Sequence, residues 1–404
     1  MKKSKKKWLK FRHRVVRVIA GWVFGILTKI KYGIKIEKFR EQGNRPYLIL
    51  MNHQTPFDQF FVGLAFKGPV YYLATEDIFS IGFVSKLLRW AVAPIPIRKQ
   101  TTDVSAVITC MRVAKEGGTI ALSPEGNRTY SGRTEYINPA IASLAKKLGL
   151  PIALYRIEGG YGCCPRWSDV VRKGNIRSYV YKVIEPEEYN TLSNEELTEL
   201  IEQGLYVDEG VADGEYVSDK RAEYLERAMY VCPFCGLSEF RSEGNEAECL
   251  TCHRRITYGT DKRIEGIGFD FPFEFMTEWY DYQKEFVNSL DTLENTEQPL
   301  FCDTATMSEV IVYKNKNMLK ENCSLKLYGD RMTIDEGLDG MLEFKFSETS
   351  ALSVLGRNKL NVYYKDKVYQ FKGDKRFNAL KYVNLYYRCK NILKGEKDGQ
   401  FLGL

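Results

Sequence analysis

The residues best suited to chemistry are a histidine and an aspartate five positions apart, His53 and Asp58. The chain has three histidines, and His53 is the one that follows a short apolar run, residues 47–51, and precedes an acid. A carboxylate that holds one imidazole nitrogen fixes the tautomer of the ring and stabilises the imidazolium that forms when the other nitrogen takes a proton. The pair therefore predicts a general base with its orienting acid. The plainer interpretation is a buried histidine beside an aspartate that caps a helix.

Two elements must position this pair. Residues 47–51 form a continuous apolar run, which is typical of a short strand covered on both faces. Pro56 suits the first turn of a helix that follows Thr55, and such a helix would hold Asp58 near its start. Backbone N–H groups at this helix start are candidate donors to an oxyanion.

A second polar group follows another apolar run, residues 119–122. This group is Ser123-Pro124-Glu125-Gly126-Asn127-Arg128-Thr129. Upstream of it, a strand-like apolar piece at 94–98 ends in Arg98. Because a guanidinium matches two phosphate oxygens at once, Arg98 and Arg128 are candidates to bind a phosphate, with ordinary surface ion pairs as the alternative. Gly126 would let the backbone approach a ligand closely.

In their order and spacing these blocks resemble the glycerolipid acyltransferase family, which includes the lysophosphatidate and glycerol-3-phosphate acyltransferases. The matching blocks are N-H-x4-D at Asn52 to Asp58, the apolar piece that ends in arginine at 95–98, P-E-G-x-R at Pro124 to Arg128, and the apolar segment with a proline at 150–154. The resemblance covers roughly residues 30 to 190. It departs at Asn127, where the family usually has threonine, and this departure bears on acceptor preference.

The resemblance implies an α/β acyltransferase domain of αβα type and a membrane-associated O-acyltransferase activity. A fatty acyl group would pass from an acyl thioester, acyl-CoA or acyl carrier protein, to the hydroxyl of a lysophospholipid. The first candidate acceptor is 1-acyl-sn-glycerol 3-phosphate, in phospholipid biosynthesis. His53 would take the hydroxyl proton and Asp58 would orient His53. The implied acceptor-site residues are Arg98, Glu125, Gly126 and Arg128.

The sequence around the pair bears on the route of transfer. No serine or cysteine adjoins His53 and Asp58, which favours direct transfer without an acyl-enzyme. A serine or cysteine brought close by folding stays as the alternative.

The positive charge of the chain is concentrated at its N-terminus. Residues 1–40 hold fourteen lysines and arginines against one acid, Glu37, whereas the whole chain has a net charge of +7. The apolar run from Val15 to Leu27 is interrupted by Arg17 and is too short to span a bilayer of about 30 Å. No small-residue cleavage site follows it, so a signal peptide is not expected.

An apolar helix beside a lysine cluster favours the interface of an anionic membrane. We therefore expect peripheral or monotopic association with the cytoplasmic face of the cell membrane. The alternative is a basic tail on a helix that packs against the catalytic domain.

Four cysteines form two C-x2-C pairs thirteen residues apart: Cys232, Cys235, Cys249 and Cys252. This spacing predicts a zinc ribbon with a structural Zn²⁺, because four thiolates close the tetrahedron and leave no position for a reacting water. His253 is a competing ligand, and a pair of disulfides is the weaker alternative because no secretion signal precedes the domain. The remaining cysteines show no pairing pattern and favour a reducing cytoplasm.

The length of 404 residues predicts two to four domains, and 44% apolar with 27% charged residues is typical of a globular protein. The last hundred residues contain short alternating strands, one of them at 309–313, and a helix at 376–393. This arrangement resembles a pleckstrin-homology-like (PH-like) β-barrel plus helix, which leaves lipid-headgroup binding and protein docking both open. A further helix is predicted at 216–230.

The predicted organisation is a basic amphipathic membrane-association segment at 1–35, an acyltransferase domain at 36–190, a helical linker at 191–230, a zinc ribbon at 231–262, a connecting helix at 263–300 and a PH-like domain at 301–404. Two other function classes compete with the enzyme. One is a membrane-bound adapter that keeps the acyltransferase fold without turnover. The other is nucleic-acid binding through the ribbon and the basic tail, but a charge excess confined to the N-terminus argues against nucleic acid as a partner.

Overall fold

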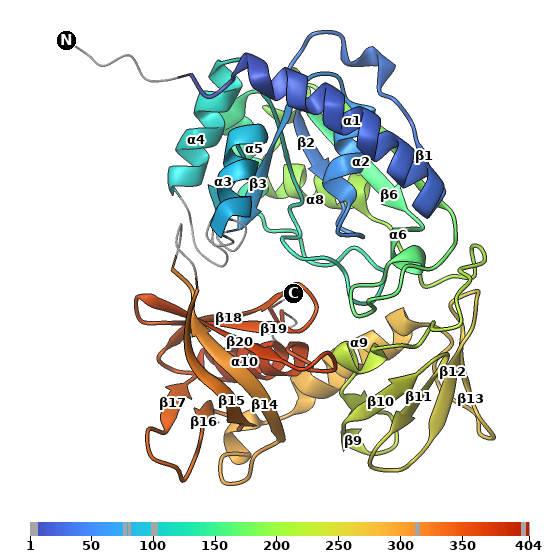
Figure 1. Cartoon of the computed structure of the whole chain (residues 1–404), viewed down its shortest axis with the longest axis vertical. Coiled ribbons are helices and arrows are strands. Elements are labelled where there is room, and N and C mark those ends of the chain that lie inside the picture. Colours follow the sequence, from blue (N-terminus) through green and yellow to red (C-terminus); the bar gives the residue numbers. More distant parts are fainter. Residues whose placement is uncertain are drawn as a thin grey trace. The chain divides into compact units, whose positions relative to one another are not determined.

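The computed structural model describes residues 7–75, 79, 82–97, 104–311, 316–396 and 401–403 (Figure 1). The candidate residue Arg98 lies outside these ranges. The chain divides into two compact units. The first consists of residues 1–165 and 173–209, and the second of residues 166–172 and 210–404.

The first unit is built on a seven-stranded sheet with the order β1-β7-β6-β2-β5-β3-β4. Its strands are β1 (Ile34–Ile36), β2 (Leu48–Met51), β3 (Val70–Thr75), β4 (Ile95–Ile97), β5 (Thr119–Leu122), β6 (Ile152–Glu158) and β7 (Ile176–Ile184). The five strands from β2 to β6 are mutually parallel, whereas β7 runs antiparallel to β6. Because parallel strands end at the same edge of a sheet, the segments that follow β2 and β5 meet there.

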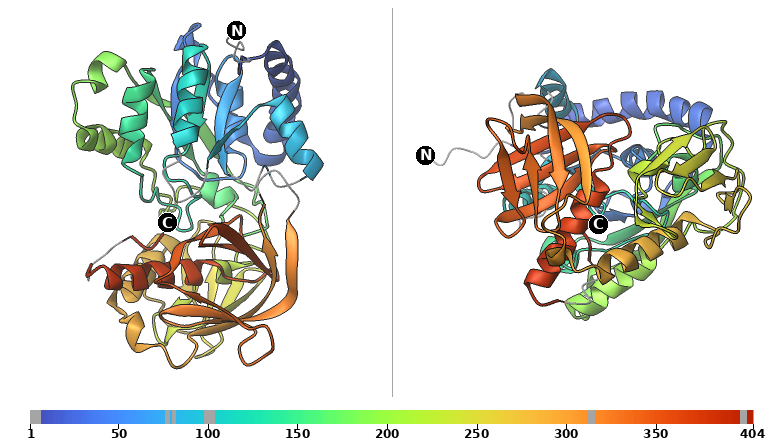
Figure 2. Two further views of the ribbon diagram at one scale, coloured as in Figure 1. Left: turned by 90° about the vertical axis from the view of Figure 1, so that its left-hand side faces the viewer. Right: turned by 90° about the horizontal axis from the view of Figure 1, so that it is seen from below.

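Helices cover both faces of this sheet (Figure 2). They are α1 (Phe11–Tyr32), α2 (Asp58–Ala65), α3 (Gly82–Ala91), α4 (Val104–Lys115), α5 (Ala140–Leu148) and α8 (Asn194–Leu205), with short turns at α6 (Gly160–Cys163) and α7 (Pro186–Tyr189). Helix α1 packs on α2 and α3, while α5 packs on α4 and α8. The central strands are fully buried, with Leu48, Ile120 and Leu154 in one core cluster. The predicted α/β class and doubly covered strands are therefore confirmed.

Helix α8 corrects the predicted linker at 191–230. Its start is a capping box, in which the Ser193 hydroxyl accepts from the Glu196 N–H at 3.0 Å and the Glu196 carboxylate accepts from the Ser193 N–H at 2.6 Å. The helix buries Leu197 and Ile201 in the core of the first unit, so it does not act as a spacer. The predicted helix at 216–230 is also wrong: this stretch consists mainly of turns, with one 3₁₀ turn at Leu225–Arg227.

The second unit begins with a small four-stranded antiparallel sheet of order β10-β11-β12-β13 and a two-stranded hairpin β8-β9. These strands are β8 (Val231–Cys232), β9 (Gly236–Leu237), β10 (Phe240–Glu243), β11 (Glu246–Cys249), β12 (Arg255–Tyr258) and β13 (Ile264–Gly266), and helix α9 (Met276–Ser289) follows them. The segment 166–172, from between β6 and β7, also belongs to this unit. Its Arg172 guanidinium lies over the rings of Trp167 and Tyr258.

The rest of the second unit is an antiparallel seven-stranded sheet that nearly closes on itself, with the order β17-β16-β15-β14-β20-β19-β18. Its strands are β14 (Phe301–Glu309), β15 (Asn317–Leu327), β16 (Arg331–Ile334), β17 (Leu342–Lys345), β18 (Thr349–Leu355), β19 (Lys359–Tyr364) and β20 (Lys367–Gly373), and helix α10 (Leu380–Leu393) ends the unit. The expected barrel-like sheet with a terminal helix is present. The strand predicted at 309–313 is displaced, because β14 ends at Glu309, and residues 312 and 313 lie outside the described ranges.

Candidate active site

His53 and Asp58 meet as predicted at the carboxyl end of β2. His53 lies two residues beyond the end of β2, and Asp58 is the first residue of α2. The Nδ1 atom of His53 is 2.7 Å from Oδ2 of Asp58. The imidazole is 25% exposed, whereas the aspartate side chain is fully buried. Because Nδ1 faces the carboxylate, Nε2 is the nitrogen that can exchange a proton with a substrate.

The Asp58 carboxylate is held by the loop that joins β2 to α2. It accepts hydrogen bonds from the Gln54 N–H at 2.9 Å, from the Thr55 N–H at 2.9 Å and from the Thr55 hydroxyl at 2.6 Å. These donors compensate for the burial of the carboxylate and leave it one orientation. Thr55 is thus a site residue that the sequence analysis did not identify. The N–H groups of Gln54 and Thr55 are directed at Asp58, so an oxyanion would need other donors, and that expectation stays a prediction.

Glu125 positions the backbone of His53. Its Oε1 accepts the His53 N–H at 2.7 Å, and its Oε2 accepts the Glu135 N–H at 3.2 Å. Burial raises the pKa of Glu125 to about 8, against the opposite effect of the two backbone donors. The His53 carbonyl in turn accepts the Thr129 N–H at 3.1 Å. Both backbone groups of His53 are therefore fixed by the loop that follows β5.

Asn52, the residue between β2 and His53, is fixed by strand β6. Its amide donates to the Ile157 carbonyl at 2.8 Å and accepts the Ile157 N–H at 2.8 Å, and the side chain is fully buried. The amide of Asn52 thus extends the pairing of β2 with β6 beyond the last residue of β2. This role was not predicted, although Asn52 belongs to the N-H-x4-D block. Only the fold shows that Ile157, 105 residues away, is its partner.

The loop from Ser123 to Thr129 lies against His53 and carries two further candidates. Gly126 has a φ of +69°, a left-handed conformation that favours glycine, and its N–H donates to the Ser123 carbonyl at 3.1 Å. Arg128 is half-buried on the same loop. The pairing of Arg128 with Arg98 around a phosphate stays a prediction, since Arg98 is outside the described residues.

The four predicted cysteines also come together. The Sγ atoms of Cys232, Cys235, Cys249 and Cys252 all lie within 4.8 Å of one another. Tetrahedral Zn–S bonds of about 2.3 Å imply Sγ atoms roughly 3.8 Å apart, and the Cys232 to Cys252 distance is 3.9 Å. Exposed His253 is paired through Nδ1 with Glu248 at 2.8 Å, so the four thiols are the donor set that fits a metal.

Gly236 explains why the first cysteine pair can turn so tightly. Its φ is +76°, and a Cβ at this position would lie 3.0 Å from the Phe286 ring of α9. A glycine therefore suits this position, since its backbone adopts the left-handed conformation without strain.

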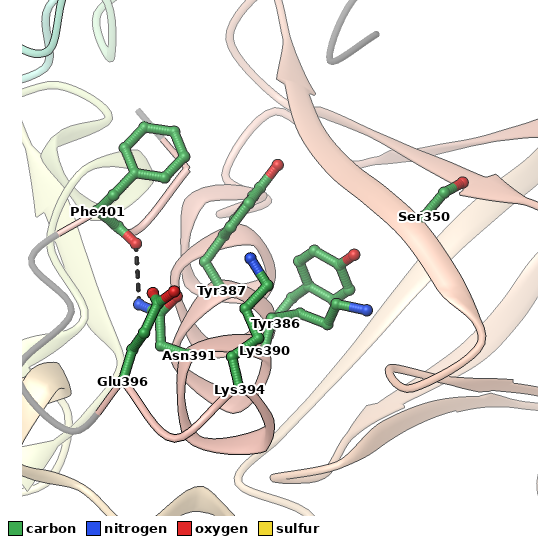
Figure 3. A pocket seen from close by; sticks show the side chains of 8 residues that line it. All are labelled: Ser350, Tyr386, Tyr387, Lys390, Asn391, Lys394, Glu396 and Phe401. Atoms are coloured by element: carbon green, nitrogen blue, oxygen red, sulfur yellow. Dashed lines mark hydrogen bonds between the residues drawn. The ribbon is translucent and has the colours of Figure 1, made fainter.

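A pocket of about 300 Å³ in the second unit is lined by side chains of α10, by Ser350 of β18, and by Lys394, Glu396 and Phe401 (Figure 3). Asn391 donates from its amide to the Phe401 carbonyl at 3.1 Å, and Lys390 and Lys394 are the cationic groups in the lining. The lining contains no histidine. The pocket therefore offers no counterpart to the His53–Asp58 pair.

Comparison with known proteins places the His53 site inside a recognised domain. Residues 33–156 match the family model described as Acyltransferase. A chloroplastic 1-acyl-sn-glycerol-3-phosphate acyltransferase of Arabidopsis thaliana is 24% identical over 202 residues, which is 48% of this chain and 54% of that protein. A 1-acyl-sn-glycerol-3-phosphate acyltransferase of Borreliella burgdorferi is 27% identical over 141 residues, which is 34% of this chain and 54% of that protein.

The chain thus spans about half the length of the curated relatives it matches. Among solved structures, the 1-acyl-sn-glycerophosphate acyltransferase PlsC from Thermotoga maritima is 21% identical with a TM-score of 0.42, covering 48% of this chain and 78% of that chain. The family match and the relatives identify an acyltransferase domain that contains His53, Asp58 and the loop after β5.

Proposed function

We propose that the acyltransferase domain transfers a fatty acyl group from an acyl thioester to the free hydroxyl of 1-acyl-sn-glycerol 3-phosphate. The observation that carries this proposal is the His53–Asp58 pair, 2.7 Å apart, with the backbone of His53 fixed by Glu125 and Thr129. The names of the relatives support the choice of acceptor. Acyl-CoA and acyl carrier protein are both suitable donors.

In the proposed reaction, Nε2 of His53 takes the proton of the acceptor hydroxyl as its oxygen attacks the thioester carbonyl. The resulting imidazolium is stabilised by the Asp58 carboxylate at Nδ1. Collapse of the tetrahedral intermediate breaks the carbon–sulfur bond, and the departing thiolate takes the proton back from Nε2. The products are the ester and the free thiol. The imidazole is 25% exposed, so an acceptor can approach it.

The acceptor phosphate would bind to Arg128, together with Arg98. Arg128 lies on the loop whose Thr129 N–H is bonded to the His53 carbonyl, so a phosphate held there would bring the glycerol hydroxyls toward His53. Two guanidinium groups would supply the planar donor pairs that phosphate oxygens accept best.

The test is an assay of the purified full chain with lysophosphatidate or glycerol 3-phosphate as acceptor and with acyl-CoA or acyl carrier protein as donor. Product formation is measured by mass spectrometry. His53→Ala should lower kcat by about 10²- to 10⁴-fold, the usual contribution of a general base. Circular dichroism of both proteins checks that the variant is folded. If the wild-type chain forms no ester with any donor and acceptor, the adapter alternative replaces the enzyme.

We further propose that the four cysteines bind one structural Zn²⁺. The donor set supports this, because four sulfur ligands at tetrahedral spacing suit zinc and provide no open coordination position. The ion would cross-link the two turns of a ribbon. The barrel-like sheet with α10 would serve as a PH-like binding module, for a lipid headgroup or for a protein.

We also propose that the protein associates with the cytoplasmic face of the cell membrane. The support for this is the charge excess of residues 1–40 and the acyl chain of the proposed acceptor. Within the described residues, no helix combines the length and the hydropathy needed to cross a bilayer. We propose that the association is peripheral or monotopic, with the basic N-terminal segment at the headgroups.

A further inference from the structure

Helix α1 packs Phe24 on Phe60 of α2, but it also directs two polar side chains toward the domain and many apolar side chains outward. Toward the domain it directs His13, which is 2% exposed and lies 3.0 Å from the Tyr71 hydroxyl through Nδ1. It also directs inward Arg17, whose guanidinium donates to the Phe66 carbonyl. The outward face carries exposed Phe11 (79%) and Trp22 (72%). The other exposed apolar residues of this face are Val15, Val18, Ile19, Val23 and Ile26.

Helix α3 has the same property. Phe83, Leu87 and Trp90 recur at helical spacing and are 78%, 50% and 53% exposed, whereas Ser85 is buried. Residues three, four and seven positions apart share one face of a helix, so these three side chains form a single outward stripe. An ordinary surface helix would place this stripe in the core and Ser85 outside.

The two outward faces are neighbours. Helices α1 and α3 are in contact on the same side of the sheet (Figure 2). The Arg12 side chain joins them: its Nε donates to the Trp90 carbonyl at 2.8 Å, and its guanidinium lies 5.5 Å from the Trp90 ring. The exposed apolar side chains of both helices therefore belong to one surface, which we call the α1–α3 surface.

The charges that the described residues of α1 and α3 place on this surface have one sign. Neither α1 nor α3 contains an aspartate or a glutamate. Exposed Lys86 and Arg89 flank the stripe on α3, and exposed Arg14 lies on α1. Large exposed aromatic residues among cations, without acids, are the composition of an element that lies in the headgroup region of an anionic bilayer. A protein partner of the usual kind would be matched by charges of both signs.

We propose that the α1–α3 surface docks the acyltransferase domain on an anionic lipid bilayer, with Phe83, Leu87 and Trp90 of α3 entering the interface beside α1. The inference deepens the proposed function, since a lipid acceptor has its acyl chain in that bilayer. Strands β2 and β3 are parallel through β5, so α3 begins at the same edge of the sheet as His53. The acceptor headgroup can reach the site while its acyl chain stays in the membrane.

The first test follows Trp90 directly. In the full chain, Trp8 and Trp22 are replaced by phenylalanine, which leaves Trp90 together with Trp167 and Trp279, both fully buried. Vesicles that contain phosphatidylglycerol and brominated lipids should quench the fluorescence of Trp90. The triple variant that also carries Trp90→Phe supplies the background. Quenching no greater than this background would overturn the proposal.

The second test measures vesicle binding by sedimentation. Phe83→Ser, Leu87→Ser and Trp90→Ser together should weaken binding by roughly tenfold or more, because most of the apolar area that α3 can bury is removed. The control replaces Leu338 and Met341 of the second unit, which are 65% and 43% exposed, by serine and should bind as the wild type does. Binding should also fall when phosphatidylcholine replaces phosphatidylglycerol.

Other outcomes separate this inference from the proposed function. If the serine variant binds vesicles normally, or if α3 instead mediates a dimer that analytical ultracentrifugation finds in the wild type and not in the variant, the bilayer is the wrong occupant. If the variant loses vesicle binding while the wild type transfers no acyl group, the docking surface stands and the proposed reaction fails. With short-chain, water-soluble substrates, the variant should keep the activity of the wild type.

Discussion

The two candidate sites of this chain are supported in different ways. The His53 site is held together by contacts between distant parts of the chain. The backbone of His53 is bonded to Glu125, 72 residues away, and the side chain of Asn52 is bonded to Ile157, 105 residues away. The cysteine cluster is local, since Cys232 and Cys252 are 20 residues apart and each pair sits in a tight turn. One site therefore depends on the packing of a large core, and the other on the ligand that would join its turns.

This difference indicates how each site should fail. The first unit buries a continuous apolar core, so loss of one contact near His53 should change the geometry of the site and leave the fold intact. The cysteine segment at 231–262 has strands of only two to four residues, so we expect the proposed zinc to contribute much of its stability.

Removal of the metal should produce the largest effect. Structural zinc contributes an apparent binding free energy of about 10–16 kcal/mol in small zinc-finger domains, so a chelator should unfold the ribbon around 231–262. Hydrogen exchange of these residues, together with zinc analysis by mass spectrometry, measures the change. Cys249→Ser should lose the zinc, whereas Cys302→Ser, an exposed cysteine outside the cluster, should retain it. A ribbon that stays protected from exchange without metal would contradict the local dependence.

Replacement of Glu125 should have a smaller effect that is confined to catalysis. In Glu125→Gln, one carboxylate oxygen becomes an amide NH₂, which cannot accept one of the two backbone N–H groups, so the His53 backbone shifts. We expect kcat to fall about 10- to 100-fold, as for a small misplacement of a catalytic group, while KM changes less. Glu185→Gln, at an exposed ion pair with Arg45, is the control and should keep full activity. Equal losses in both variants would refute a positioning role.

Because the pKa of Glu125 is raised, the Tm of the wild type and the Tm of Glu125→Gln should depend differently on pH. A carboxyl group whose pKa is higher in the folded chain stabilises the fold in its protonated form. This stabilisation is complete below the ordinary glutamate pKa of 4.5 and disappears as the pH rises through the Glu125 pKa of about 8. The Tm of the wild type should therefore fall relative to that of Glu125→Gln between about pH 4.5 and 8. Parallel Tm profiles across this window would be the contrary result.

The contact between His53 and Asp58 could be predicted because both residues lie in one short block. His53 follows a continuous apolar strand and Asp58 begins the next helix, so local patterns were sufficient. The supporting roles of Asn52 and Glu125 could not be predicted, because their partners are defined by the order of strands in the sheet. The same holds for Thr55, whose hydroxyl has a partner only once the loop has closed on Asp58.

The fold was predictable where apolar runs were strong. Continuous apolar runs form strands β2, β5 and β6. The stretch at 216–230 instead mixes charges with isolated apolar residues and folds into turns. Strand β14 was missed because its buried residues, Phe301, Ala305 and Met307, are separated by small polar residues that resemble a loop. The place of 166–172 in the second unit depends on contacts such as the bidentate pair of Asp169 with Arg227, which no local pattern shows.

The smallest predicted effect separates stability from positioning within the first unit. Ser193→Ala removes the capping hydroxyl of α8, which should cost about 1 kcal/mol and lower the Tm of this unit by about 2–4 °C. Helix α8 contributes to the core under β6, but its cap makes no contact with His53, Asp58 or their hydrogen-bond partners. At temperatures below the transition, kcat should therefore equal that of the wild type. If this variant lost as much activity as Glu125→Gln, any loss of stability in the first unit would lower the activity. The loss in Glu125→Gln would then be no evidence that Glu125 positions His53.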